Sequence, residues 1–313
     1  MPDQKRLFLV DAYALIFRGY YAFIKNPRIN SKGLDTSAIL GFMNSLLDVI
    51  KRERPDYLAV CFDKGGSSDR NALFEDYKAN RDETPEAIKI AVPYIESILN
   101  AMHIPIVVKE GYEADDIIGT LASTVRSENS NVAVHILSKD KDLAQLLKNK
   151  TDCLWDYSAN KRRYLDDIRT EYGVSPEQFA DYLGLVGDPV DCISGVPGVG
   201  PVKAKLLLKE FGSLDGVYKN LDRIPKLSMR GSSALTNTLV ENRESAFLSR
   251  TLATIQCAVD DNEETFSTVS LNMLNLKEID RSAFALFLDD YRFCNSEKHK
   301  LIEMVSDLST QVV

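Results

Sequence analysis

Acidic residues follow each of the first four apolar runs in the chain, and acids in this arrangement could bind metal ions. They are Asp11, Asp63, Glu113, Asp115, Asp116, Asp140 and Asp142. One acid at such a position is unremarkable, because Asp commonly caps helices and forms turns. Four successive runs that all end in acids predict a shared site, because parallel strands in an α/β sheet present their carboxyl ends at one edge.

The crowding of these carboxylates indicates which ions they would hold. Like charges raise each other's pKa, so a group of ionised carboxylates needs positive counter-charge. Mg²⁺ and Mn²⁺ prefer oxygen ligands, and Mg²⁺ also binds phosphate oxygens. Two such ions can activate a water and stabilise both oxygens of an in-line phosphoryl displacement. We therefore expect two divalent ions, Mg²⁺ or Mn²⁺, at this edge.

A second group of motifs lies between residues 187 and 205. Asp188 and Asp191 join the metal site only if the fold returns their loop to the sheet edge, and a plain turn is the alternative. The glycine-rich stretch after them leads into a helix and predicts a helix–hairpin–helix, which binds phosphate through backbone N–H groups without reading bases. Its candidate DNA-binding residues are Gly195, Gly198, Gly200, Lys203 and Lys205.

Basic and aromatic residues between the second and third groups of acids are candidate phosphate contacts. Lys78 and Arg81 lie three residues apart and would share one face of a helix, with Arg70 about two turns before Lys78. Tyr77 could stack on a base, while a solvated charged face is the usual alternative. A similar pair near the first acid is explained at least as well by core packing. That pair consists of Arg18 and Tyr20.

The apolar runs are predicted to be strands of a central sheet. They cover residues 7–10, 57–62, 104–108, 132–137 and 153–157. Most are continuously apolar, as in parallel strands that are buried on both faces. Helical patterns alternate with them, at 36–52, about 71–100 with an interruption at 84–85, 113–125 and 142–148. The first half is therefore predicted to be α/β, with a mostly parallel central sheet and flanking helices.

Strand patterns stop after about residue 175, and the second half is predicted to be mainly helical. Its helices are expected at 176–186, 202–211, 232–249 and 281–291. We expect an α/β core over residues 1–174, which includes a helical segment at about 70–100. The second domain, residues 175–313, is expected to bind DNA through a helix–hairpin–helix at about 185–210.

The composition of the 313 residues excludes several classes of protein. It is 44% hydrophobic and 27% charged, as in an ordinary globular protein. The five cysteines form no C-x-x-C pair and the three histidines lack zinc-ligand spacing, which excludes a disulfide framework and a histidine-based metal site. No signal peptide and no apolar run long enough for a membrane span are found, so we expect a cytoplasmic protein without membrane partners.

The net charge of −8 at first argues against a nucleic-acid partner, because basic surface usually carries phosphate binding. Nine of the 46 acidic residues are, however, candidates for one metal site. The remaining acids nearly balance the 38 basic residues. The acidic total therefore reflects the predicted site and does not exclude DNA.

The ordered motifs resemble those of the 5′-nuclease domain at the N-terminus of bacterial DNA polymerase I, within the flap-endonuclease superfamily. The resemblance covers about residues 5–291. Its motifs are Leu9-Val-Asp11, Phe62-Asp63, Tyr77-Lys-Ala-Asn-Arg81, Tyr112-Glu-Ala-Asp-Asp116, Ser138-Lys-Asp-Lys-Asp142, Gly187-Asp-x-x-Asp191 and Gly195-Val-Pro-Gly-Val-Gly200. The chain departs from the family pattern before Arg70, at Ser194 and at Lys203, where the hairpin lysine stands one position late.

The resemblance implies a PIN-like nuclease core and a metal-dependent 5′→3′ exonuclease or flap endonuclease. It also implies that the segment at about 70–100 is a helical gateway through which a 5′ single strand passes. It implies DNA substrates with a 5′ flap, nick or 5′ end, and RNA–DNA hybrids at primers, in replication and repair. All nine acids would serve the metal site, Lys78, Arg81 and Arg70 would act in catalysis, and the hairpin would bind K⁺. A monomer at the bacterial nucleoid, with a polymerase domain in the same or a separate chain, is expected.

Three rival functions remain open at this point. A related ribonuclease could use the same acid-edged sheet, but it gives no reason for the helix–hairpin–helix. A phosphatase of the haloacid-dehalogenase type is disfavoured, because Asp11-Ala-Tyr13 lacks the second acid of Asp-x-Asp. A DNA junction-binding module would leave the acids without a catalytic role.

Overall fold

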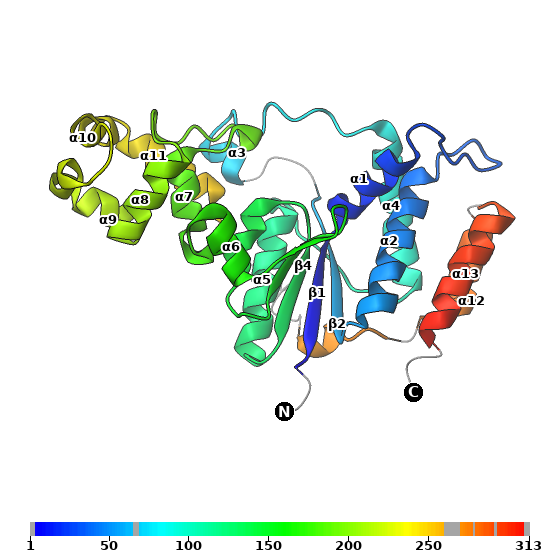
Figure 1. Ribbon diagram of the computed structural model, residues 1–313. Helices are drawn as coiled ribbons and strands as arrows, with labels where there is room; N and C mark the ends of the chain where they lie inside the picture. Colours follow the sequence, from blue (N-terminus) through cyan, green and yellow to red (C-terminus); the bar gives the residue numbers. More distant parts are fainter. Residues whose placement is uncertain (1–3, 65–68, 260–269, 278, 291–292, 310–313) are drawn as a thin grey trace.

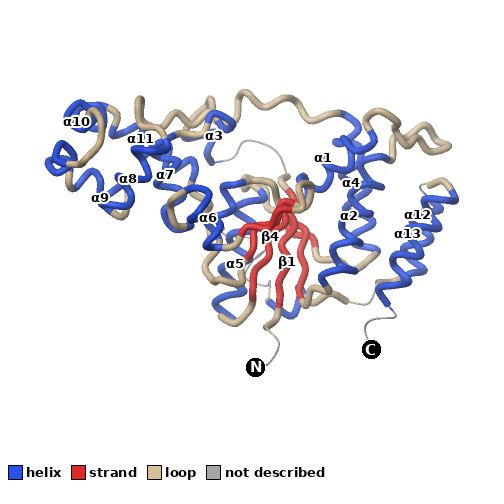
Figure 2. Tube along the Cα trace, viewed as in Figure 1, coloured by secondary structure: helices blue, strands red, loops and turns tan. Residues whose placement is uncertain are grey.

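The computed structural model describes residues 4–64, 69–259, 270–277, 279–290 and 293–309. Its centre is a six-stranded sheet in the order β3-β2-β1-β4-β5-β6 (Figures 1 and 2). The strands are β1 (Arg6–Asp11), β2 (Tyr57–Phe62), β3 (Ile106–Val108), β4 (Ala133–Leu137), β5 (Cys153–Asp156) and β6 (Lys161–Arg163). The first five are parallel, as predicted, while β6 pairs antiparallel with β5 and was not predicted.

The central strand β1 explains why its sequence is continuously apolar. Leu7, Phe8, Leu9 and Val10 are all fully buried. Leu7 and Leu9 belong to the core on one side of the sheet, and Phe8 and Val10 to the core on the other, because successive side chains of a strand point to opposite faces. Asp11 ends this strand beside Cys61 of β2, so the first polar side chain emerges at the carboxyl edge.

Helices cover both faces of the sheet. One face carries α5 (Ala114–Glu128), and the other carries α1 (Ala12–Phe23), α2 (Ser37–Glu53) and α4 (Glu86–Ala101) (Figure 1). α1 and α2 cross at Gly19 and Gly41, where a Cβ added to Gly41 would lie 2.2 Å from the Gly19 Cα. The last helices, α12 (Arg281–Asp290) and α13 (Asn295–Ser309), return to pack against α4 and α2.

The second half forms a helical unit beside the α5 face (Figure 1). Its elements are α6 (Leu165–Tyr172), η2 (Pro176–Gln178), α7 (Phe179–Val186), η3 (Pro189–Asp191), α8 (Pro201–Phe211), α9 (Leu214–Lys219), η4 (Leu221–Lys226), α10 (Ser232–Glu241) and α11 (Arg243–Ala253). The single helix predicted over 232–249 is in fact two, which meet at Asn242. The predicted helix 281–291 is α12, and its residue 291 lies outside the described part. None of the described helices is long and apolar enough to cross a bilayer.

The helical pattern predicted over about residues 71–100, with an interruption at 84–85, is confirmed over 86–100 and wrong over 74–83. The structure has a short α3 (Asp69–Leu73), then turns, and α4 begins only after Pro85. Lys78 has a left-handed backbone conformation with φ of 59°, which a right-handed helix cannot contain. Pro85 also disfavours a helical conformation at Thr84. The segment 74–85 therefore connects α3 to α4 above the sheet without regular secondary structure (Figure 1).

Candidate active site

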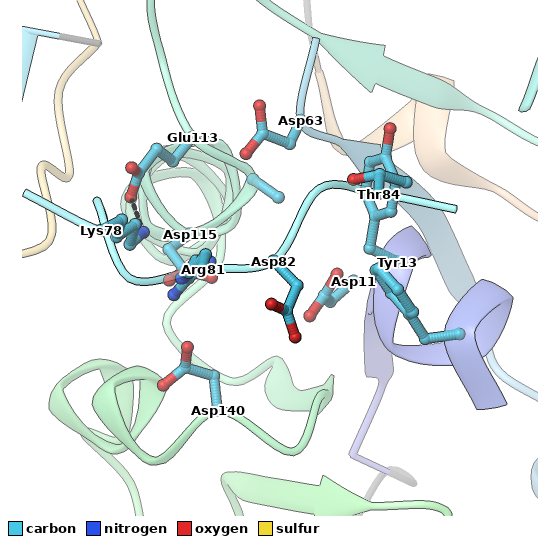
Figure 3. A pocket seen from close by; sticks show the side chains of 12 residues that line it. Asp11, Tyr13, Asp63, Lys78, Arg81, Asp82, Thr84, Glu113, Asp115 and Asp140 are labelled. Carbon is cyan, nitrogen blue, oxygen red and sulfur yellow. Dashed lines mark hydrogen bonds and ion pairs between the residues drawn. The ribbon is translucent and has the colours of Figure 1, made fainter. Parts of the chain in front are cut away.

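A pocket of about 300 Å³ opens at the carboxyl edge of the sheet (Figure 3). Five predicted metal residues line it: Asp11, Asp63, Glu113, Asp115 and Asp140. Lys78 and Arg81, the predicted phosphate contacts, line it as well. The side-by-side ends of β1, β2 and β4, together with the first turn of α5, bring these residues together although they are distant in sequence.

Asp11 shows how the end of a strand positions a carboxylate. It caps α1, and its Oδ1 accepts a hydrogen bond from the Ala14 N–H at 3.3 Å, while its Oδ2 accepts one from the Ser138 hydroxyl at 2.8 Å. Burial nevertheless raises the pKa of Asp11, and the charge of Asp140 raises it further. The fold therefore fixes this carboxylate in orientation and makes its negative charge costly.

Two further carboxylates carry the same electrostatic cost. Burial raises the pKa of Asp115 well above its usual range, with added repulsion from Asp140 and Asp11. Burial, followed by the charge of Asp140, raises the pKa of Asp142 to about 7. Among the described residues, no donor reaches the buried Oδ1 of Asp142, and the Lys141 ammonium stands 3.5 Å from it. Lys78 and Lys141 offset only part of this negative charge, and a bound cation would offset more of it.

The donor set fits hard divalent ions. Within the described ranges, no three His, Cys, Asp or Glu side chains are already arranged to bind one metal ion. The groups at the pocket are nevertheless oxygen donors, several have raised pKa values, and one buried oxygen of Asp142 has no hydrogen bond. Because Mg²⁺ usually keeps several waters, it needs only a few direct protein ligands. The acids could therefore hold such ions directly or through water.

Lys78 and Arg81 contact the acids from the segment above the pocket. The Lys78 ammonium lies 2.7 Å from Glu113 Oε2 and 3.9 Å from Asp191 Oδ2, and Arg81 donates to Asp191 Oδ1 at 2.6 Å. Although burial opposes it, Glu113 raises the pKa of Lys78, so the ammonium stays charged. These contacts also show that the loop carrying Asp191 returns to the sheet edge. This return was the condition for Asp191 to join the metal site.

Lys141 is a cation of this site that the sequence motif did not single out. It forms an ion pair with Asp188 and stands next to Asp142. Asp188 is buried, and its Oδ1 accepts the Val190 N–H at 3.0 Å. Asp142, Asp188 and Asp191 do not line the pocket itself. The available signal was the alternation of Lys and Asp in Ser138-Lys-Asp-Lys-Asp142.

Arg70 and Asp116 do not line the pocket and pair with each other, and Arg70 also donates to Glu113 Oε2, on the pocket wall, at 3.4 Å. Both Nη atoms of Arg70 donate to the two oxygens of Asp116, each at 2.7 Å. Arg70 also donates to the carbonyls of Leu252 and Thr254, at 2.9 and 2.8 Å. Asp116 is 1% exposed and accepts the Gln256 N–H at 2.9 Å. The pair therefore joins α3, the first turn of α5 and the chain after α11.

The predicted aromatic and basic contacts near the site are engaged within the protein. Tyr77 is 5% exposed and donates to Glu113 Oε2 at 3.3 Å. The Arg18 guanidinium lies 4.8 Å from the ring centre of Tyr157 and donates to a serine hydroxyl of α2. Tyr20 packs edge-on against Tyr21, with ring centres 5.2 Å apart. In this structure the three side chains therefore contact other side chains of the protein.

The predicted hairpin is present between α7 and α8. Gly187 and Gly195 both have positive φ, and a Cβ on Gly195 would lie 2.3 Å from the Gly187 nitrogen. Gly198 also has positive φ, whereas a Cβ added at Gly198 or Gly200 would meet open space. The inner glycines thus close the hairpin, and the outer ones leave its backbone accessible.

The two predicted hairpin lysines follow on α8. Lys203 donates to the Gly198 carbonyl at 2.8 Å, so its ammonium lies on the hairpin itself. The aliphatic stem of Lys205 covers Gly173. The hairpin therefore carries a fixed positive charge beside its open backbone.

Sequence reasoning missed several residues that line the pocket. They are Tyr13, Phe17, Asp82, Thr84 and Ala114. Tyr13 and Phe17 are one turn apart on α1, with ring centres 6.1 Å apart, and give the pocket an aromatic wall. Burial, followed by the charge of Asp63, raises the pKa of Tyr13. The signal was their helical spacing directly after Asp11, which requires recognising α1 as a helix.

An acid-lined pocket with basic side chains above it, at the edge of a parallel sheet and next to a phosphate-binding type of hairpin, defines a class of nuclease. Two family models match the chain: the 5′-3′ exonuclease N-terminal resolvase-like domain at residues 6–173, and the 5′-3′ exonuclease C-terminal SAM fold at 174–282. The chain belongs to the 5′-3′ exonuclease family.

Similar proteins agree with this membership. The chain is 35% identical to a 5′-3′ exonuclease of Buchnera aphidicola, covering 93% of this chain and 92% of that protein. It is 36% identical to DNA polymerase I of Caldicellulosiruptor bescii over 88% of its own length, but spans about a third (32%) of that polymerase. A bacteriophage T5 flap endonuclease, solved with DNA and metal ions, has a similar fold, with a TM-score of 0.62 at 20% identity over 96% of this chain and 100% of that one.

Proposed function

We propose that the chain is a structure-specific 5′ nuclease, which hydrolyses DNA phosphodiester bonds at 5′ flaps, nicks or 5′ ends. The observation that carries this proposal is the pocket in which five acids face Lys78 and Arg81. Acids that bind metal and bases that bind phosphate are both needed where a phosphodiester is hydrolysed. The adjacent hairpin would grip the duplex beside the scissile bond.

The ion site is proposed to be formed by seven acids, directly or through water. They are Asp11, Asp63, Glu113, Asp115, Asp140, Asp142 and Asp191. Mg²⁺ or Mn²⁺ bound there would supply an activated water and charge stabilisation on the phosphate. Asp188 would act through Lys141, and Asp116 and Arg70 through their mutual pair, because their side chains are occupied there.

The chain's own residues have separable tasks in this mechanism. Lys78 and Arg81 now bind Glu113 and Asp191, and they would turn to the phosphate oxygens once other cations neutralise these acids. There they would stabilise the charge that develops during attack. Tyr13 and Phe17 would offer an apolar wall to the nucleotide at the scissile bond.

Further expectations about ligands and partners belong to the same proposal. RNA–DNA hybrids would be cut like DNA, because the hairpin contacts backbone rather than bases. K⁺ binding at the hairpin would have to share the Gly198 carbonyl with Lys203. The DNA polymerase I relatives support a polymerase domain as a partner, in the same or a separate chain. A monomer in the cytoplasm, at the nucleoid, would complete this arrangement.

A 5′-labelled flap substrate, incubated with and without Mg²⁺, tests the proposal. We expect cleavage near the single-strand junction with Mg²⁺ and none with EDTA. Asp115→Asn/Asp140→Asn should lower the rate at least about a thousandfold, because several kcal/mol of transition-state stabilisation are lost. Asp166→Asn/Asp222→Asn removes two exposed acids outside the pocket and is the matched control.

Normal cleavage by a folded Asp115→Asn/Asp140→Asn variant would overturn the mechanism. Tight binding of the flap in Mg²⁺ without any product would overturn the enzymatic proposal as a whole. Preference for single-stranded RNA over flapped DNA would instead indicate the ribonuclease function.

A further inference from the structure

A second cationic surface lies on the helical unit, outside the acid-lined pocket. It is a groove of about 700 Å³ between α8 and the turn that follows η4. Four basic side chains line it: Lys203, Lys205, Lys209 and Arg230. Among the described residues that line this groove there is no carboxylate. A groove with this charge selects a polyanion.

The cations of this groove are not neutralised by the protein. Within the described part of the chain, Lys205, Lys209 and Arg230 have no acidic partner within ion-pair distance, unlike Lys78, Arg81 and Lys141 at the pocket. Lysine and arginine side chains that remain unpaired on one face keep their full charge for a ligand. The contrast indicates that this groove binds its anion without a metal ion.

The helical spacing of α8 explains how the groove is built. Val202, Lys205 and Lys209 are separated by three and four residues, so they lie on one face of the helix. Met229 and Arg230 approach from the turn opposite. Val202 is 83% exposed, which leaves an apolar strip between the charges. Sugar rings between phosphates would pack on such a strip.

The groove continues from the hairpin. Lys203 lines the groove and at the same time donates to the Gly198 carbonyl of the hairpin. A backbone that is bound at the hairpin would therefore meet Lys203 first and the remaining cations next. This continuity favours nucleic acid over an acidic peptide, which would need only the groove.

We propose that this groove binds the phosphate backbone of the duplex as a second contact, beyond the hairpin. The proposal rests on the proposed nuclease function for its choice of ligand, while its evidence is independent of the acid-lined pocket. The hairpin would set the position of the duplex, and the groove would set how far along the duplex contact extends.

The salt dependence of binding tests this proposal. Each lost phosphate contact lowers the slope of log K against log salt by about 1. Fluorescence anisotropy with a labelled duplex in EDTA should therefore give Lys209→Ala/Arg230→Ala a slope lower by about 2, and weaker binding at low salt. Val202→Lys adds a cation at an exposed position and should raise the slope by about 1.

Lys150→Ala/Lys277→Ala is the matched control. These two exposed lysines lie before β5 and after the short helix η5 (Leu271–Leu274), at the amino ends of the strands and away from the pocket edge. The control should leave the slope unchanged, since neither lysine lines the groove or the pocket. If the control and the groove variants lowered the slope equally, the net charge of the protein would explain the effect, and the proposal would be overturned.

Unchanged slopes in both groove variants would also overturn the proposal. If an aspartate-rich peptide then bound the wild type and not Lys209→Ala/Arg230→Ala, the groove would be a peptide site instead. Flap cleavage distinguishes this failure from failure of the proposed function. If the wild type does not cut the flap but the groove variants change the slope as expected, the groove contact stands and the proposed nuclease function is wrong.

Discussion

At the scale of single residues, Lys78, Arg81 and Lys141 partly neutralise the carboxylates of the site. Each is bound to a carboxylate of the site, and these contacts offset part of the repulsion between the acids. Asp11, Asp115 and Asp142 keep raised pKa values despite them. The site is therefore only partly neutralised by its own chain, which leaves room for metal ions and for an exchange of partners.

Lys78→Ala and Arg81→Ala test this exchange. Each variant should lower kcat by about 10²–10³ and change KM much less, because the side chain stabilises charge that develops only during the reaction. Single-turnover kinetics on the flap substrate measures both quantities. Lys89→Ala, which removes an exposed lysine of α4, is the control. A change confined to KM would assign Lys78 and Arg81 to binding alone.

Arg70→Met should unfold the protein more easily, since it leaves Asp116 buried without its partner. Breaking a buried pair on one side costs about 3–5 kcal/mol. The double variant Arg70→Met/Asp116→Leu should be less destabilised, because no charge remains buried. Urea unfolding measures both. Arg169→Met, at an exposed pair with Asp166, should cost less than about 1 kcal/mol.

At this scale the sequence correctly predicted that acids from several strand ends lie at one edge of the sheet, but it did not predict which neighbours Arg70 and Asp116 contact. Strand ends fix the position of Asp11 and Asp63, and any alternation of strands and helices would place them at one edge. Whether a carboxylate faces the pocket or a neighbour depends on what packs against it. Arg70 reaches Asp116 because the chain after α11 crosses there, and no local pattern encodes that crossing.

The elements around the hairpin separate folding from binding. Gly195→Ala should destabilise the protein strongly, because its Cβ would collide with Gly187 and its φ is positive. Gly200→Ala should fold normally, since its Cβ meets open space, but should weaken duplex binding by obstructing the approach of phosphate. Thermal unfolding and anisotropy on both variants check this. A Gly200→Ala variant that bound normally would place the phosphate elsewhere.

Element prediction succeeded where burial determined the pattern and failed where tertiary contacts did. Most of the five parallel strands are continuously apolar, and all five were predicted. The gateway segment was expected to be helical because its charges recur at helical spacing. In the structure its turns are held by other parts of the chain: the Lys78 N–H bonds the Asp191 carbonyl at 3.1 Å, and Asn80 bonds the Pro189 carbonyl at 2.9 Å.

At the scale of the whole molecule, His135 makes stability depend on pH. It is buried beside Phe8, and burial, followed by Arg6 and Arg162, lowers its pKa from 6.5 to about 4. The unfolded chain therefore binds this proton more tightly than the folded one. Stability from this group is complete above about pH 6.5 and is lost as pH falls toward 4, by up to about 3 kcal/mol.

His135→Leu should remove this part of the acid sensitivity. Urea unfolding at several pH values should show the stability difference between wild type and variant shifting in favour of the variant below pH 6.5. His299→Leu, an exposed position on α13, is the control and should follow the wild type. Parallel curves for wild type and His135→Leu would contradict the assignment.

The rate at which the buried thiol of Cys61 is alkylated would report how often the protein opens around it. The thiol lies on the central strand pair, fully buried beside Asp11, and burial raises its pKa strongly. Cys257 and Cys294, in contrast, are exposed and free. An alkylating reagent can reach the exposed thiols directly, whereas the Cys61 side chain packs in the core that α5 covers and can react only when that core opens. Its rate of alkylation therefore reports openings of the core between α5 and the sheet, in the working protein and without any introduced probe.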